Sequence, residues 1–194
     1  MVIRNVIVCM AYLALPISSV AALRNHGQRP GNQPTQVEPN AQEDLAVVAQ
    51  KLIAVIGEDN EAELVKFWSH SGVSFGVDAA VIGKRAFLSQ LQKKQDLYCF
   101  FFNTDCLRKH DEEQRRVANA PPRKDFLYSY RDLLRGASSK EVKVSEYKDH
   151  DLLLGRVLVN LTMNEKMSGG RGRVLEFAFA KENGSWKLTS VPYD

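Results

Sequence analysis

An Asn-Gly pair near the end of the chain constrains the fold more than any other feature. Asn183 and Gly184 separate two short runs, 174–181 and 186–191, that are rich in β-branched, aromatic and aliphatic residues. The pair supplies the two positive-φ residues that a type I′ turn requires, so the two runs are predicted to form a β-hairpin.

The same turn sets the register of the hairpin. The expected pairs are Lys181 with Trp186, Phe179 with Leu188 and Phe177 with Ser190. Because side chains alternate between the two faces of a strand, one face is then almost wholly apolar. This face holds Leu175, Phe177, Phe179, Trp186 and Leu188. A two-stranded hairpin is marginal by itself in water, so the rest of the chain is expected to cover this face.

Residues 1–22 have the layout of a secretory signal peptide. A start that carries Arg4 leads into an apolar run, 6–17, and then into small residues that end at Ala21 and Ala22. The run is short for a membrane span and contains Pro16. We therefore expect cleavage near Ala21 or Ala22, a secreted or periplasmic location, and no stable membrane span after cleavage.

The remaining chain divides into a tether and one domain. Residues 23–42 are rich in Gly, Pro, Asn and Gln and contain few apolar side chains, which predicts a disordered tether. Residues 43–194 are long enough for one sizeable core and are expected to form a single α+β domain. The chain carries 26 basic and 23 acidic residues, and this near balance gives no reason to expect a nucleic-acid partner.

The first half of this domain has helical periodicity. Apolar residues at helical spacing predict a helix that begins at Leu45 and stops at Gly57. Asp59 or Asn60 is placed to cap a second helix, with Glu63 positioned for a capping box on Asn60. A strand at 73–77, a return strand at 81–82 and a third helix at 84–94 are expected to follow.

The second half is predicted to be mainly β. The apolar run 97–102 is interpreted as a strand, followed by an atypical charged excursion, 103–140, that contains a short helix capped by Asp125. Strands at 142–147 and 152–163 precede the closing hairpin. The expected fold is a curved antiparallel sheet of about five to six strands, with three N-terminal helices packed on one face.

Several local sequences resemble the NTF2-like (cystatin-like cone) superfamily. They are Phe67-Trp68, the Gly72–Phe75 segment, the Val81–Leu88 segment with its helix-starting Gly, and the closing hairpin with a Trp just after its turn. The resemblance implies a cone-shaped pocket between helices and sheet, and a homodimer formed through the sheet. The excursion at 103–140 departs from the family's shorter connection.

Two sets of residues are candidates for the site. The aromatic residues expected to line a cone pocket are Trp68, Tyr98, Phe100, Phe102, Phe177 and Phe179. Some members of the superfamily use a His–Asp pair, or a Tyr and an Asp, for proton transfer. By residue type alone, the alternative catalytic candidates are His70, Asp78, Tyr98 and Asp105. An exposed His at the end of a helix is the interpretation that the sequence favours for His70.

The cysteines and the charged clusters suggest structural roles. Loss of the signal peptide removes Cys9 and leaves Cys99 and Cys106, which are predicted to form a disulfide. His110 to Glu113 is flanked by basic residues, which indicates a solvated surface of mixed charge rather than a metal site. The sequence contains no Gly-rich phosphate loop, no nucleophile elbow, no CxxC and no HExxH, so no cofactor is expected.

Two functions fit these observations. The favoured hypothesis is an exported, non-catalytic module that binds a small apolar ligand or a protein partner. The alternative is a pocket enzyme, such as an isomerase, a dehydratase or a hydrolase, that uses His70 with a nearby carboxylate. A scaffold of this kind supports both, so the geometry of the candidate residues has to decide.

Overall fold

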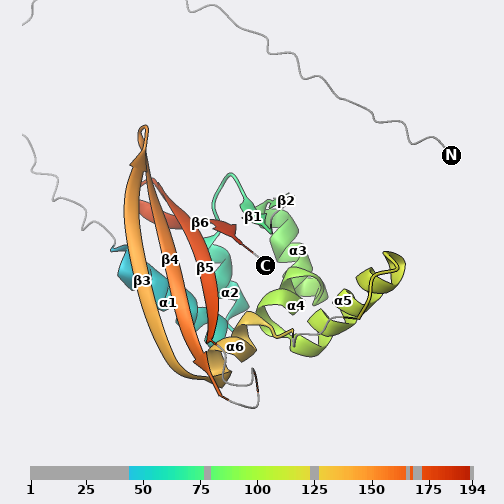
Figure 1. The fold of residues 1–194 in the computed structure, drawn as a ribbon. Helices are drawn as coiled ribbons and strands as arrows, with labels where there is room; N and C mark the ends of the chain where they lie inside the picture. Colours follow the sequence, from blue (N-terminus) through green and yellow to red (C-terminus); the bar gives the residue numbers. More distant parts are fainter. Residues whose placement is uncertain (1–43, 77–79, 123–126, 165–166, 168–171, 193–194) are drawn as a thin grey trace, which may run out of the picture. The chain divides into compact units, whose positions relative to one another are not determined.

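The computed structural model describes residues 44–76, 80–122, 127–164, 167 and 172–192. The expected signal peptide, the expected tether and Asp78 lie outside these residues. Within the described part the chain forms a mixed six-stranded sheet with helices on one face, which confirms the predicted α+β class (Figure 1).

The sheet has the strand order β2-β1-β6-β5-β4-β3. Neighbouring strands are antiparallel except for β1 and β6, which are parallel, so the sheet is not wholly antiparallel as the sequence suggested. The parallel pair arises because the last strand returns to lie beside the first hairpin. The strands are β1 Val73–Phe75, β2 Ala80–Ile82, β3 Ala137–Asp149, β4 Leu152–Met163, β5 Gly172–Glu182 and β6 Ser185–Val191.

The helices include the three that the sequence predicted and further ones. The helices are α1 Leu45–Gly57, α2 Glu61–Leu64, the 3-10 turn η1 Val65–Phe67, α3 Lys84–Lys93, α4 Leu97–Phe102, α5 Thr104–Val117 and α6 Tyr130–Gly136. The cap expected at Asn60 is present, because its side chain accepts a hydrogen bond from Glu63 N at 3.2 Å. Gly83 stands at the N-cap position of α3, as expected.

The closing hairpin follows its predicted register for most of its length. Lys181 pairs with Trp186 and Phe179 pairs with Leu188. A β-bulge then shifts the register, so that Ser190 lies opposite Ala178 and not opposite Phe177 as expected. The bulge bends β6 away from β5, and β6 pairs with β5 only between Ala178 and Glu182.

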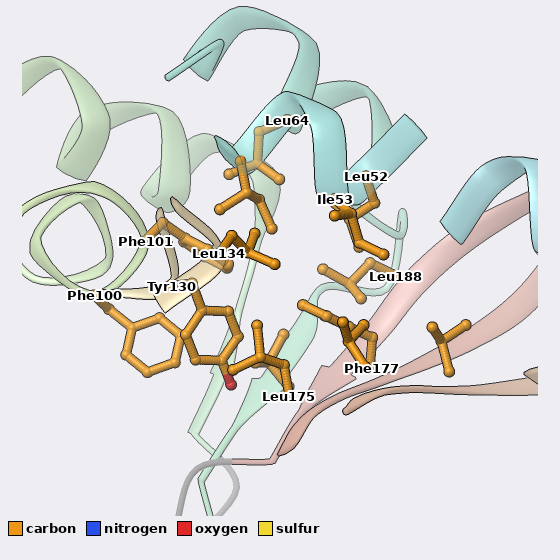
Figure 2. Packing of buried hydrophobic residues seen from close by; sticks show 14 of the residues in the cluster. Leu52, Ile53, Leu64, Phe100, Phe101, Tyr130, Leu134, Leu175, Phe177 and Leu188 are labelled. Carbon is orange, nitrogen blue, oxygen red and sulfur yellow. The ribbon is translucent and has the colours of Figure 1, made fainter. Parts of the chain in front are cut away.

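The apolar face of the hairpin forms the base of the core, as predicted. Phe177, Phe179 and Leu188 are at most 1% exposed. On the helical side, Trp68 stacks on Phe87 with ring centroids 3.6 Å apart, and its indole N–H donates to Ile82 O at 2.8 Å. Figure 2 shows Phe177 and Leu188 of the sheet facing side chains from the helices. Covering this face removes large aromatic surfaces from water, which is the main source of stability here.

The prediction of a strand at 97–102 is wrong, because these residues form helix α4. Leu97, Cys99 and the three Phe residues are all buried, while Tyr98 is half-buried. When nearly every position is apolar, the run carries no period, and a short buried helix cannot be distinguished from a buried strand.

The expected irregular excursion is also more ordered than its composition suggested. Residues 104–117 form α5, a helix of 14 residues with Asn103 as its N-cap. Ion pairs one helical turn apart, Arg115 with Asp111 and Arg116 with Glu113, support a helix that buries little. Ser129 caps the following helix α6, and Asp125, the expected cap, lies outside the described residues.

Candidate functional site

The six aromatic residues expected to line a pocket are mostly core residues. Trp68, Phe102, Phe177 and Phe179 are at most 1% exposed, and Phe100 is 7% exposed. The walls of three cavities on the described part of the chain, which are described below or border α1 and α6, contain none of the six. Their assignment as pocket residues stays a prediction.

Aromatic rings fill the space between helices α4 and α6 and the sheet. Tyr130 is the centre of this cluster, with ring centroids 4.5 Å from Phe100, 5.8 Å from Phe101 and 5.7 Å from Phe177. In Figure 2 the Phe100 and Tyr130 rings lie beside each other. Edge-to-face and tilted contacts of this kind are favourable, so the cluster holds α6 against β5.

One cavity continues this cluster to the surface, and we call it the tyrosine cleft. It has a volume of about 430 Å³. Its walls come from the segment before α6, from α6, from the start of β5 and from the end of the described chain. They consist of Leu127, Tyr128, Tyr130, Leu133, Gly172, Arg173, Val174, Leu175, Glu176 and Pro192.

The tyrosine cleft exists because β6 leaves β5 early. Beyond Ala178, toward Gly172, β5 pairs with β4 but not with β6. The edge of β5 therefore borders the cleft, and a strand edge offers backbone donors and acceptors. Pro192, which follows β6, accepts a hydrogen bond from the Tyr130 hydroxyl at 3.4 Å and closes the opposite wall.

The floor of the cleft is apolar and its rim is mixed. Tyr130, Leu133 and Leu175 are at most 9% exposed, whereas Val174 at the rim is 60% exposed. The carboxylate of Glu176 accepts two hydrogen bonds from Arg156, at 2.7 and 3.0 Å, so its charge is balanced. Sequence reasoning predicted only a short helix within 103–140 and no cleft beside it. The Tyr-Ser-Tyr sequence at 128–130 was the one available signal of an aromatic wall.

His70 has a carboxylate partner that the sequence did not predict. Its Nδ1 lies 2.8 Å from Oε2 of Glu182, and its backbone N–H donates to the same oxygen at 3.2 Å. The Ser69 hydroxyl donates to the other oxygen of Glu182. Burial raises the pKa of Glu182, but the hydrogen bonds from Ser69 and His70 outweigh that effect, so its pKa lies below the ordinary value.

This arrangement differs from that of a catalytic triad. In a triad the imidazole lies between the hydroxyl and the acid, so that it can take the hydroxyl proton. Here the carboxylate lies between Ser69 and His70, and among the described residues no hydrogen bond joins the imidazole to the Ser69 hydroxyl. The His70 side chain is also 80% exposed, as expected for a His at the end of a helix. The pair ties the loop after η1 to the closing hairpin.

The remaining catalytic candidates are dispersed. The Lys94 ammonium lies over the Tyr98 ring, 4.2 Å from the centroid of that ring, and Tyr98 also packs against Phe102. Asp105 is exposed in the first turn of α5. In the described part of the chain no hydrogen bond joins His70, Tyr98 and Asp105, and Asp78 lies outside that part.

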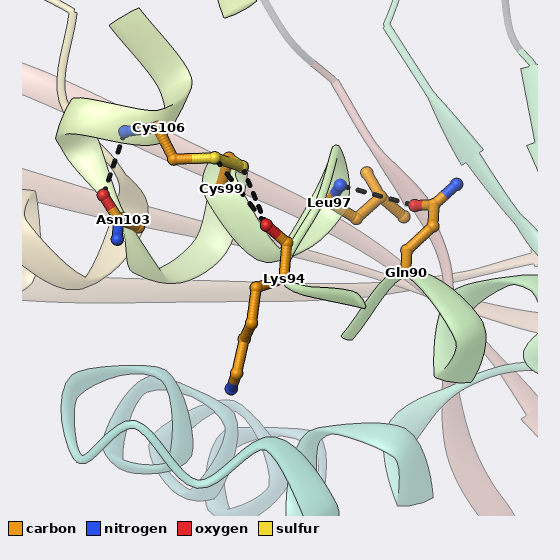
Figure 3. The surroundings of a disulfide bond; sticks show 6 residues. All are labelled: Gln90, Lys94, Leu97, Cys99, Asn103 and Cys106. Carbon is orange, nitrogen blue, oxygen red and sulfur yellow. Dashed lines mark hydrogen bonds between the residues drawn. A yellow bond between two sulfur atoms is a disulfide. The ribbon is translucent and has the colours of Figure 1, made fainter. Parts of the chain in front are cut away.

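Cys99 and Cys106 form the predicted disulfide, which links α4 to α5 (Figure 3). Their Cα atoms are 5.2 Å apart, within the usual range for such a bond. Asn103, between them, caps α5 by accepting from Cys106 N at 2.9 Å. The cap and the disulfide together hold the sharp change of direction between the two helices.

In the cluster His110 to Glu113 every residue is exposed except Asp111, which is half-buried, and Asp111 and Glu113 pair with arginines of the same helix. Among the residues that the structure describes, no group of His, Cys, Asp and Glu has the arrangement of a metal site. The described helices also include none that is long and apolar enough to cross a membrane.

Comparison with known proteins adds resemblance of fold only. No family model matches the chain, and no curated protein is similar to it. Among solved structures, it is similar to Rd1NTF2_05 with long sheet, with a TM-score of 0.40, 11% identity, and coverage of 79% of this chain and 98% of that one. It is also similar to a protein of unknown function with a cystatin-like fold from Nostoc punctiforme, with a TM-score of 0.40, 11% identity, and coverage of 77% and 88%.

A third similar structure is an uncharacterized cystatin fold protein from Novosphingobium aromaticivorans, with a TM-score of 0.35, 10% identity, and coverage of 78% and 98%. Their titles name the NTF2-like or cystatin-like fold. At TM-scores of 0.40 or less, these similarities carry no argument about the fold or the function of this chain. The description of the fold rests on the strand order and the helix placement of this chain.

Proposed function

We propose that this protein is an exported, non-catalytic binding module that takes a small apolar ligand in the tyrosine cleft. The observation that carries the proposal is the cleft itself. Its volume of about 430 Å³ falls within the range of roughly 300–1,000 Å³ typical of small-molecule sites. Its floor of Tyr130, Leu133 and Leu175 is continuous with the aromatic core.

The chemistry of the walls favours a ligand with a flat or branched apolar body and few polar groups. Tyr128 and Tyr130 offer ring faces and edges, which favour aromatic and aliphatic groups. The adjacent edge of β5 offers backbone groups that would orient a polar substituent. Glu176 is balanced by Arg156, so it does not impose a demand for a cationic ligand.

The catalytic alternative has less support. It needs His70 and a carboxylate inside a concave apolar pocket. The His70–Glu182 pair exists, but the His70 side chain is 80% exposed, and neither residue lines the tyrosine cleft. The pair is better explained as a structural tie.

Binding of the neutral fluorophore N-phenyl-1-naphthylamine tests the proposal. We expect saturable binding to the native protein and a loss of affinity of about tenfold or more in Val174→Arg, which places a charged side chain at the rim. The matched control is Val81→Arg on β2, because Val81 is 65% exposed and lies outside the cleft. Equal binding by both variants would refute the cleft as the site. Turnover of ester or enol substrates that is lost in His70→Ala would refute the non-catalytic assignment.

Export is part of the proposal. Its support is the signal-like layout of residues 1–22 and the Cys99–Cys106 disulfide, since disulfides persist in oxidising compartments. N-terminal sequencing of the protein recovered from the periplasm or the medium should find a start near Ala22 or Leu23. An intact Met1 would contradict it.

A homodimer formed through the sheet is the partner that we propose. Its support is that the face of the sheet opposite the helices carries apolar side chains in contact with solvent, among them Tyr147 and Leu152, which are 51% and 57% exposed. Light scattering should give twice the mass of one chain for the wild type and the mass of one chain for Tyr147→Glu. A monomeric wild type would refute the dimer without affecting the proposed cleft.

A further inference from the structure

A second cavity, distinct from the tyrosine cleft, is lined by arginines, and we call it the arginine cavity. It has a volume of about 580 Å³ and lies where the start of α5 meets α6. Its walls include Arg108 from α5 and Arg131 and Arg135 from α6. Tyr128 contributes to the walls of both cavities.

Two of the three guanidinium groups are held in place through a single nitrogen. Arg108 donates from Nε to Leu127 O at 3.0 Å, and its guanidinium lies 4.9 Å from the Tyr128 ring centroid. Arg135 donates from Nε to Gly57 O at 2.7 Å. In the described part of the chain, the terminal Nη groups of both have no hydrogen-bond partner. One nitrogen of each side chain is anchored to a backbone carbonyl, and its terminal donors are unused among the described residues; Arg108 is half-buried and Arg135 is exposed.

The third arginine is already neutralised. Arg131 donates from Nε to Asp132 at 2.9 Å and from Nη1 to Asp59 at 2.6 Å. Asp132 also accepts from the Thr104 hydroxyl at 2.6 Å, so both of its oxygens are occupied. Burial opposes ionisation of Asp132, but these hydrogen bonds outweigh it and lower its pKa, so this carboxylate stays charged and paired.

The described walls of the cavity carry three arginines and two aspartates. Arg131 is paired with Asp132 and with Asp59, which does not line the cavity, whereas Arg108 and Arg135 have no acidic partner among the residues described. Asp105 is the remaining carboxylate of the described wall, and it is exposed. The start of α5, a helix of 14 residues, adds a partial positive charge from its free backbone N–H groups.

We propose that the arginine cavity binds a small oxyanion, a carboxylate or a phosphate, through the Nη groups of Arg108 and Arg135. The planar fork of a guanidinium matches two oxygens of either group, and such charge-assisted hydrogen bonds are about twice as strong as neutral ones. The site rests on Arg108 and Arg135, neither of which lines the tyrosine cleft, although Tyr128 borders both cavities. Because α5 belongs to the charged excursion at 103–140, the site depends on the part of the chain that departs from the shorter family connection.

Calorimetric titration of the full chain with inorganic phosphate, and separately with citrate, tests the proposal at constant ionic strength set with chloride. We expect saturable binding of at least one anion. Comparison of the affinities for phosphate and citrate shows whether the site prefers a phosphate or a carboxylate. Arg108→Gln and Arg135→Gln should each weaken it about tenfold or more, which corresponds to about 1.4 kcal/mol. Asp105→Asn should tighten binding, because it removes the like charge from the wall.

The control is Arg116→Gln, which removes a positive charge from the same helix but outside the cavity. Arg135→Lys keeps the positive charge but loses the planar fork of the guanidinium, so this variant should bind the anion with intermediate affinity. Partial binding by Arg135→Lys would show that the loss in Arg135→Gln comes from the missing charge and not from misfolding. No saturable binding of either anion, or equal weakening in Arg116→Gln, would overturn the proposal. Arg135→Gln should still bind the neutral fluorophore. The anion site and the tyrosine cleft can therefore be refuted separately.

Discussion

Nδ1 of His70 lies 2.8 Å from Oε2 of Glu182, although 112 residues separate the two in the chain. Glu182 is the last residue of β5, and His70 lies between η1 and β1. The carboxylate therefore joins the start of the sheet's first hairpin to the turn of its last one. This relationship makes Glu182 a structural residue whose effect depends on its charge.

Glu182→Gln should lower the free energy of unfolding at pH 7 by about 1–3 kcal/mol, because it weakens hydrogen bonds to a charged acceptor. The pKa of Glu182 is lower in the folded state than its ordinary value of 4.5. Its stabilisation is therefore present above that value and is lost as the pH falls through the folded pKa. Urea unfolding at pH 7 and at about pH 3 should show a smaller loss on acidification in the variant than in the wild type.

The control for this measurement is Glu146→Gln, because Glu146 is exposed on β3 and has no side-chain hydrogen bond in the described part of the chain. Its stability should follow the wild type at both pH values. If the free energy of unfolding of Glu182→Gln and of the wild type changed equally with pH, the charge of Glu182 would contribute nothing to stability.

Phe179→Ala should destabilise the protein by about 3–5 kcal/mol, as large truncations in a core do. Phe179 is 1% exposed and pairs with Leu188 across the closing hairpin. Ser145→Ala on the exposed part of β3 should change stability by less than about 0.5 kcal/mol. Urea melts of the two variants make the comparison, and a cost near zero for Phe179→Ala would mean that the hairpin does not anchor the core.

Gly155→Ala should destabilise the protein by about 1–3 kcal/mol through overpacking. A Cβ at Gly155 would lie 2.5 Å from Leu45 Cδ2 and 3.2 Å from Trp186 Cζ3, and both side chains are buried. Gly57→Ala is the matched control, because a Cβ there meets nothing within 4 Å at the end of α1. It should be neutral or slightly stabilising, and thermal melts in which both variants behave alike would contradict the close approach at Gly155.

Loss of the Cys99–Cys106 disulfide should cost about 2 kcal/mol, because the bond closes a short loop. The test is chemical unfolding of a variant with both cysteines replaced by Ala, with and without a reducing agent. The wild type should lose stability on reduction and the variant should not. Two free thiols, titrated at these positions in the unfolded and unreduced wild type, would rule out the bond.

Much of the local structure followed from sequence. The Asn183-Gly184 pair predicted the turn and the pairing of Phe179 with Leu188, because a tight turn transmits its register along both strands. Helical spacing predicted α1 as far as Gly57, and the Asn60 cap was identified from its offset to Glu63. Loss of Cys9 with the expected signal peptide leaves Cys99 and Cys106, and their predicted disulfide is present.

The conformation of 97–102, the bulge near Ser190 and both cavities were decided only by the tertiary structure. Three consecutive Phe residues have no period, so their surroundings determined that they form a helix in contact with Phe87 and Tyr130. The arginine cavity depends on Arg108 and Arg135, each anchored to a carbonyl oxygen on another segment. A local pattern specifies turns, caps and faces within a few residues. Which distant side chains share a cavity is set by how the helices and strands pack, and that packing depends on contacts across the whole domain.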